Sequence, residues 1–217
     1  MQTKQFLWKF LFLLLAELSW SQAALEEGEK LFVWDKPEEA RPKLEEALLR
    51  DSQNERIYYY LSIVYQQLKN PVKAIEVLQR GLPLAQRMKD VMLYQIALNY
   101  QLLGDNNLAE KYYSLALETN GVLADAYLNR ANSRMKLLRY KEAIEDYRSY
   151  LRLKPEARQR KEIEKLIALL EQDFANQEKL LQSILDSLKN ASTDTKTNSA
   201  GIDEFRDTSN DEVDIMD

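Results

Sequence analysis

Two neighbouring carboxyl groups can act as a general acid and a general base. Such pairs occur at three places, Glu38/Glu39, Glu45/Glu46 and Glu145/Asp146. Each pair has Lys or Arg nearby, on what the surrounding pattern predicts to be the polar face of a helix. We therefore expect solvated surface rather than a proton-transfer site at all three places.

Other kinds of catalysis lack the residues they need. The chain has no histidine and no cysteine, so the commonest proton-transfer residue, a thiolate nucleophile and the usual zinc ligands are missing. Its five glycines form no phosphate-binding loop, and no serine has the surroundings of a nucleophile elbow. We expect a protein that is not an enzyme, with no catalytic residue, no metal, no cofactor and no small-molecule substrate.

Two arginines are better candidates for binding. Arg130 and Arg134 lie four residues apart on a predicted helix, where earlier parts of the chain have apolar or aromatic residues. A guanidinium facing a protein core is costly unless a carboxylate pairs with it. In one interpretation Glu162 and Glu164 supply those carboxylates. In the other, the two arginines make an anion contact with the carboxylate of a partner.

A repeat of 34 to 35 residues must position these side chains. Its clearest markers are four alanines at intervals of 34, 35 and 34 residues, Ala40, Ala74, Ala109 and Ala143. Each period contains two amphipathic patterns, such as the apolar series Leu93, Ile96, Ala97 and Tyr100. Spacings of three and four residues indicate one face of a helix. Pairs of helices that recur at this period stack into a solenoid.

The fourth period, from Tyr127 to Pro155, resembles the tetratricopeptide repeat family. The likeness rests on the aromatic or apolar residue that opens the first helix (Tyr58, Leu93, Tyr127), the small residue four positions later (Ser62, Ala97, Ala131), the four alanines, and Pro155. It implies an all-α, right-handed solenoid of about four helix pairs over residues 24–156. The expected pairs are 24–54, 55–89, 90–123 and 124–157.

The family resemblance also suggests a binding surface, because first helices line the concave groove of such solenoids. The residues expected to face that groove are Tyr59, Ile63, Gln66, Tyr94, Leu98, Gln101, Leu128 and Asn132. This mixture is apolar and amide-bearing with almost no charge, so it suits an extended peptide or a partner helix rather than a phosphate. The alternative is that some of these residues only pack between adjacent first helices.

The N-terminal residues 1–23 have the layout of a secretory signal peptide. Lys4 and Lys9 precede an apolar run over residues 10–16, and Ser21-Gln22-Ala23 forms a small-x-small cleavage site. We therefore expect export to the periplasm or an envelope, with no lipid because no cysteine can carry one. The alternatives are an uncleaved anchor and an ordinary buried helix.

Beyond Pro155 the sequence predicts one long helix over residues 157–189. Its apolar residues follow a spacing of four and three that is interrupted only at Gln177, namely Ile163, Ile167, Leu170, Phe174, Leu181, Ile184 and Leu188. The part before Phe174 is expected to cap the last repeat. The part beyond it is either the remainder of that capping helix or a seam that binds a partner or forms a coiled coil, which would make a homodimer through residues 163–188.

The last segment, residues 190–217, is expected to be a disordered acidic tail. It has 8 acidic and 2 basic residues and few apolar ones, so it is either an inert solubilising tail or a short docking segment. The whole chain has a net charge of −5, whereas a nucleic-acid partner would require a basic surface. The sequence thus favours a non-catalytic, exported adaptor or scaffold that binds a protein or peptide; the alternative is a structural protein that self-associates through the long helix.

Overall fold

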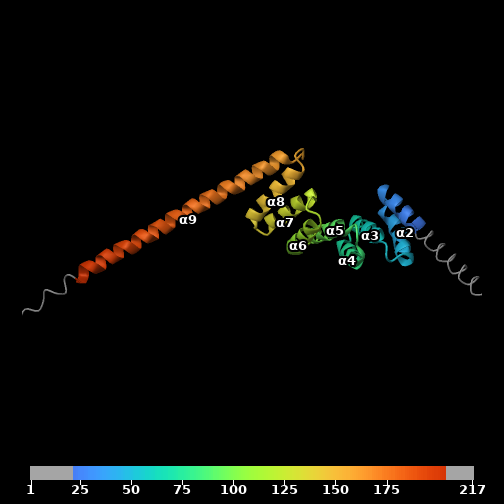
Figure 1. Ribbon diagram of the computed structural model, residues 1–217, viewed down its shortest axis with the longest axis horizontal. Coiled ribbons are helices and arrows are strands. Elements are labelled where there is room, and N and C mark those ends of the chain that lie inside the picture. Colours follow the sequence, from blue (N-terminus) through green and yellow to red (C-terminus); the bar gives the residue numbers. More distant parts are fainter. Residues whose placement is uncertain (1–21, 204–217) are drawn as a thin grey trace, which may run out of the picture. The chain divides into compact units, whose positions relative to one another are not determined.

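A computed structural model describes the backbone of residues 22–203 and the side chains of residues 22–187 (Figure 1). Throughout that described range the chain forms helices and no strands, and none of those helices is long and apolar enough to cross a membrane. The chain divides into two compact units, one ending at Arg160 and one beginning at Lys161. The expected all-α class is confirmed.

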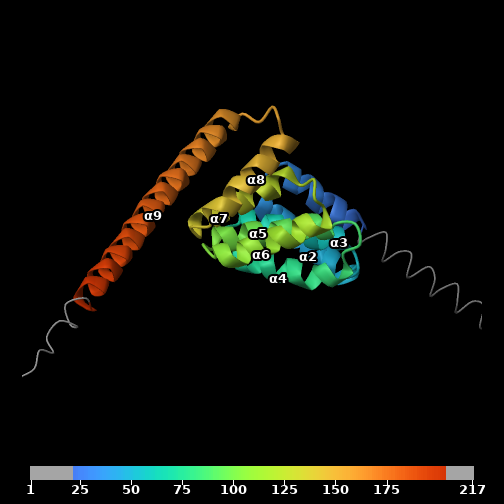
Figure 2. The same cartoon turned by 60° about the vertical axis from the view of Figure 1, so that its left-hand side comes forward.

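The first unit contains four consecutive helix pairs. A helix over residues 22–33 pairs with α2 (Pro37–Arg50), and α3 (Glu55–Gln67) pairs with α4 (Pro71–Gly81). After a short 3-10 turn, η1 (Leu82–Leu84), α5 (Lys89–Leu102) pairs with α6 (Asn106–Thr119), and α7 (Ala124–Lys136) pairs with α8 (Tyr140–Leu153). The pairs lie side by side in chain order (Figures 1 and 2). First helices of neighbouring pairs also touch, α3 with α5 and α5 with α7.

Small residues allow the helices to approach this closely. The four periodic alanines are all fully buried. Gly81 shows the constraint most sharply, because a Cβ atom there would lie 2.5 Å from Cγ of Tyr58 and 2.9 Å from the Met92 methyl group. A larger side chain at such a crossing would force the helices apart. The repeat of 34 to 35 residues in the sequence therefore marks the positions where the helices approach each other most closely.

The turn inside each pair has the same backbone conformation four times. One residue in each turn has a positive φ, with values of 56° at Asp35, 60° at Lys69, 82° at Gly104 and 61° at Leu138. The N–H of the following residue closes the turn by donating to a carbonyl five residues back, as Arg139 does to Arg134 at 2.8 Å. This hydrogen bond satisfies a carbonyl at the end of the first helix. Leu138 is the one apolar residue among these four positions, and 70% of it is exposed.

The second unit is the helix α9 (Arg160–Asp203). It begins at Arg160 rather than at the expected residue 157, and it continues past 189 into the segment predicted to be a disordered tail. No Pro or Gly interrupts residues 156–200, so nothing in this stretch strongly opposes helix formation. Residues 204–217 of the predicted tail lie outside the described residues, as do residues 1–21 of the predicted signal peptide. Capping of the last repeat by this helix stays a prediction.

The repeated turn yields a stability prediction with opposite signs at two equivalent positions. Leu138→Gly should raise the free energy of unfolding by about 1 kcal/mol, because glycine adopts positive φ without steric cost. Gly104→Ala should lower it by about the same amount. A Cβ at Gly104 would meet no atom within 4 Å, so only the backbone conformation changes. Urea unfolding followed by circular dichroism measures both, and a destabilised Leu138→Gly would contradict the strain at this turn.

Candidate functional site

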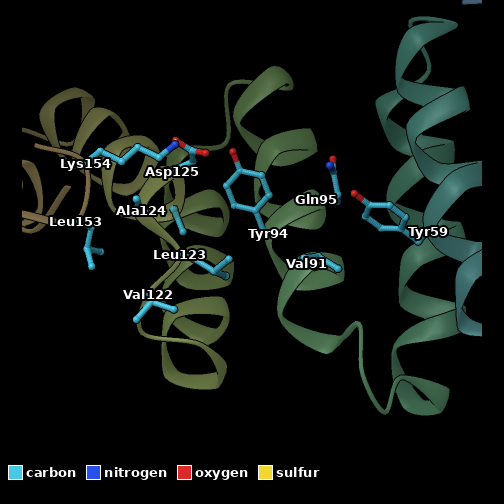
Figure 3. Close-up of a pocket in the computed structure, with 11 residues that line it drawn as sticks. Tyr59, Val91, Tyr94, Gln95, Val122, Leu123, Ala124, Asp125, Leu153 and Lys154 are labelled. Carbon is cyan, nitrogen blue, oxygen red and sulfur yellow. The ribbon is translucent and has the colours of Figure 1, made fainter. Parts of the chain in front are cut away.

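A pocket of about 540 Å³ opens along the first helices of the second, third and fourth pairs (Figure 3). Tyr59 comes from α3, and Val91, Tyr94 and Gln95 come from α5. The loop before α7, the first turn of α7 and the end of α8 supply the remaining lining residues, Val122, Leu123, Ala124, Asp125, Ala126, Leu153 and Lys154. The volume lies within the range of about 300–1,000 Å³ that is usual for binding pockets.

Two half-buried tyrosines, Tyr59 and Tyr94, line the pocket. Both stay protonated at neutral pH. Burial raises the pKa of Tyr59, and a hydrogen bond from Gln95 opposes that shift. Burial also raises the pKa of Tyr94, and the nearby Asp125 charge adds to it. The Tyr94 hydroxyl accepts a 2.9 Å hydrogen bond from Asn129 Nδ2. The Tyr94 hydroxyl therefore accepts one hydrogen bond from the protein and keeps its own O–H available as a donor.

The charges of the lining residues cancel. Lys154 Nζ lies 2.7 Å from Asp125 Oδ1, and this hydrogen bond is the main reason that the pKa of Lys154 is raised. Figure 3 shows the two side chains meeting at one end of the pocket, with Tyr94 in the centre and Tyr59 facing Gln95 at the other end. The Gln95 Oε1 atom is buried and has no hydrogen-bond partner among the described residues.

The eight residues predicted to face the groove are all half-buried in the structure. Tyr59 and Tyr94 line the pocket; Ile63, Gln66, Leu98, Gln101, Leu128 and Asn132 are not among its lining residues. Two of the amides have internal roles, because Gln101 accepts a 2.7 Å hydrogen bond from Tyr113 and Asn132 accepts one of 2.7 Å from Tyr147. Those contacts join the first and second helices of one pair, whereas the alternative considered from the sequence was packing between adjacent first helices, which stays a prediction.

The pocket also includes residues that the sequence analysis missed. Val91 and Gln95 lie on the α5 face next to the one that was predicted, and Leu153 and Lys154 come from the end of a second helix. Val122 gave a usable signal, since it is an apolar residue beside Gly121, next to the predicted boundary between the pairs 90–123 and 124–157. It is 71% exposed.

Arg130 and Arg134 form a buried ionic cluster inside the repeats. Arg130 holds Asp146 of α8 with two hydrogen bonds, Nε to Oδ2 at 2.9 Å and Nη2 to Oδ1 at 2.7 Å. Arg134 donates to Asp146 at 2.8 Å and to Glu110 of α6 at 2.9 Å. Arg139 completes the cluster on Glu110 at 2.6 Å. The cluster thus joins the third pair to the fourth.

This cluster corrects one expectation. Within the first unit the carboxylates that pair with the arginines are Asp146 and Glu110; pairing with Glu162 and Glu164 of the second unit stays a prediction. Asp146, expected on a solvated face with Glu145, is only 2% exposed, because the two guanidinium groups draw it into the pair contact. The geometry favours the internal role of Arg130 and Arg134 over an anion contact with a partner. No group of residues suited to hold a metal ion occurs in the described part of the chain.

Removing the central carboxylate should test the cluster. Asp146→Asn leaves the buried Arg130 guanidinium without a carboxylate and Arg134 with Glu110 alone, so we expect a loss of about 3 kcal/mol in the free energy of unfolding. Asp125→Asn is the matched control, because that side chain is 58% exposed and that of Asp146 is 3% exposed; the control should lose less than about 1 kcal/mol. Equal effects in urea unfolding would show that the cluster does not stabilise the fold.

Comparisons with known proteins agree on the family. One tetratricopeptide repeat model matches residues 35–91, and another matches residues 91–121 and 124–156. Among curated proteins, none matches the sequence.

Several solved structures are similar to this chain in fold. The chain is similar to MamA from Desulfovibrio magneticus RS-1, with a TM-score of 0.60, 17% identity, and coverage of 73% of this chain and 95% of that one. It is similar to YrrB, described as a TPR protein with an unusual peptide-binding site, with a TM-score of 0.54, 19% identity, and coverage of 61% and 68%.

A third similar structure is the first TPR of Spaghetti (RPAP3) bound to the HSP90 peptide SRMEEVD. Its TM-score is 0.50, with 26% identity and coverage of 58% of this chain and 96% of that one. The two repeat models together span more than half of the sequence, and the four stacked helix pairs are the architecture they describe. The chain therefore belongs to the tetratricopeptide repeat family.

Proposed function

We propose that this protein is a non-catalytic, exported adaptor that binds a segment of a partner protein in the pocket along α3, α5 and α7. The pocket itself carries this proposal. It combines apolar walls with two aromatic anchors, a pattern typical of surfaces on which a few residues supply most of the binding energy. YrrB is described as having a peptide-binding site, and the RPAP3 repeat is described as bound to an HSP90 peptide; both descriptions support a protein or peptide as the partner.

The electrostatics of the pocket support binding rather than catalysis. Its two tyrosines have their pKa values raised above 10, and its lysine is paired with a carboxylate. A general acid or base works best with a pKa near the operating pH, whereas these groups hold their protons through the neutral range. Nucleic acid, metals and small-molecule substrates have no part in the proposed function.

Export to the periplasm or envelope is the localisation we propose. It rests on the basic and apolar N-terminal residues and the small-x-small site at Ser21-Gln22-Ala23. The first helix is compatible with cleavage there, since its buried residues Ala24, Leu25 and Leu31 all follow the site. The core of the first pair would keep its contacts in the processed chain.

A charge placed in the pocket should abolish partner binding. Val122→Glu adds a carboxylate at a lining residue that is 71% exposed, and Leu138→Glu is the matched control at a residue that is 70% exposed outside the pocket. Wild-type chain and both variants serve as bait for proteins of a gently solubilised envelope fraction, quantified by mass spectrometry. We expect a set of proteins that wild type and Leu138→Glu retain and Val122→Glu loses. The same set on all three baits would overturn the pocket as the binding site.

Self-association through α9 is a second candidate function, favoured by one observation. Leu180, Leu181, Ile184 and Leu185 are 43–62% exposed within about two turns of helix. With Phe174, the residues Leu181 and Ile184 continue the spacing of four and three that a coiled coil requires. Such a seam would make a homodimer through residues 163–188.

Matched leucines on α9 separate the seam from general hydrophobicity. Leu181 is 58% exposed on the predicted seam, and Leu169 is 57% exposed beside it. If the full-length chain dimerises through this seam, sedimentation equilibrium should show a dimer for wild type and Leu169→Glu. Leu181→Glu should be monomeric, because a buried unpaired carboxylate is costly. A monomer for all three proteins removes the second candidate.

A further inference from the structure

We propose that the pocket selects an internal segment of its partner, in which an apolar side chain lies next to an exposed peptide group, and rejects a chain end that bears a carboxylate. This inference rests on the proposed function and specifies the chemistry of the ligand at the same site. Three properties of the pocket carry it: its charge balance, the hydrogen-bonding groups it offers, and its apolar walls.

The charge balance excludes a carboxylate as the main recognition element. Lys154 is the one cation among the lining residues, and Asp125 is their one anion. Their contact of 2.7 Å means that an incoming carboxylate would have to compete with Asp125 for the same ammonium group. The neighbouring Arg130 and Arg134 are held by Asp146 and Glu110. A carboxylate would therefore lose its hydration and find no cation to compensate for it.

The hydrogen-bonding groups match a peptide unit instead. Gln95 Oε1 is a buried acceptor without a partner among the described residues, and leaving such an atom unpaired costs about 1–3 kcal/mol. A donor on the ligand can satisfy it, and an ionised carboxylate has none. The Tyr59 hydroxyl faces Gln95 (Figure 3) and can donate to a carbonyl. Donor and acceptor groups side by side are what the N–H and C=O of a peptide backbone require.

The rest of the lining suits an apolar side chain. Val91, Leu123 and Leu153 are half-buried in the pocket wall, and Val122 is largely exposed at its edge. An apolar group placed against them would be removed from water together with these side chains, at about 25 cal/mol for each Å² buried. Binding energy at this site would thus come from an apolar anchor, and the polar groups at Gln95 would set the direction of the backbone.

Selection from a random-peptide library tests this ligand class with the full-length chain. We expect the enriched peptides to share an internal apolar residue and no acidic residue at the C-terminus. By fluorescence anisotropy, their free-acid and C-terminally amidated forms should bind equally, and SRMEEVD should not bind. Enriched peptides that need a free terminal carboxylate would overturn this inference and leave the adaptor proposal standing. No enrichment, or peptides that bind Val122→Glu as well as wild type, would overturn the proposed function itself.

Gln95→Leu then tests the hydrogen-bonding step. We expect it to weaken an enriched peptide about tenfold, because the peptide N–H loses its acceptor, and to leave the melting temperature unchanged or higher, because an unpaired buried oxygen disappears. Gln66→Leu, at another half-buried amide on a first helix but outside the pocket, should change neither quantity.

The two readouts also separate a ligand contact from a structural role. If Gln95→Leu lowers the melting temperature and leaves affinity unchanged, Gln95 serves the fold and the inference fails. Backbone N-methylation of the peptide, one bond at a time, gives a second measurement that does not depend on the variant. One methylated bond should weaken binding to wild type about tenfold and have little effect on Gln95→Leu, because the lost hydrogen bond is the same one; equal losses on both proteins would count against it.

Discussion

Close approach of paired helices is the constraint on which the structure depends. Four buried alanines at intervals of 34 and 35 residues let the helix axes come together, and Gly81 does so where α4 meets Tyr58 and Met92. Once each pair has this separation, the pairs stack, and stacking sets the first helices α3, α5 and α7 in one row. The pocket is a property of that row, since no single pair contains more than part of its lining.

The contact between the third and fourth pairs has a mixed character. Apolar residues join them around Tyr113 and Ala126, and the cluster of Arg130, Arg134, Asp146 and Glu110 adds charged contacts beside that core. A buried cluster of this kind adds little net stability, because the cost of desolvating the charges offsets much of their attraction. Its main effect is to favour one packing arrangement over others. It fixes one arrangement of the last pair, and so it fixes the start of α7 and the loop before it, which bring Asp125 and Val122 into the pocket.

The sequence allowed the fold to be predicted further than the site. The alanines and the small residues of the first helices are periodic, so the helix pairs follow from the pattern alone. Asp146 and Glu110 carry no such signal: each has the sequence context of a surface acid, and only the stacking of α6, α7 and α8 shows that arginines bury them. The same limit applies to Gln95 and Leu153. They line one pocket because the stacking of neighbouring pairs brings their helices together. Tyr59 and Tyr94 were predicted because they lie on the first helices that the family places around its groove.

The recurring turn with one residue at positive φ has a consequence for how such a protein can change over time. Asp35, Lys69, Gly104 and Leu138 differ in size, charge and polarity, yet main-chain hydrogen bonds give all four the same conformation. Substitutions there alter the outer edge of the stack at a modest energetic cost and leave the helix crossings untouched. That edge is therefore free to acquire new contacts during evolution independently of the row of first helices. One array of repeats can in this way gain a second binding specificity and keep its first.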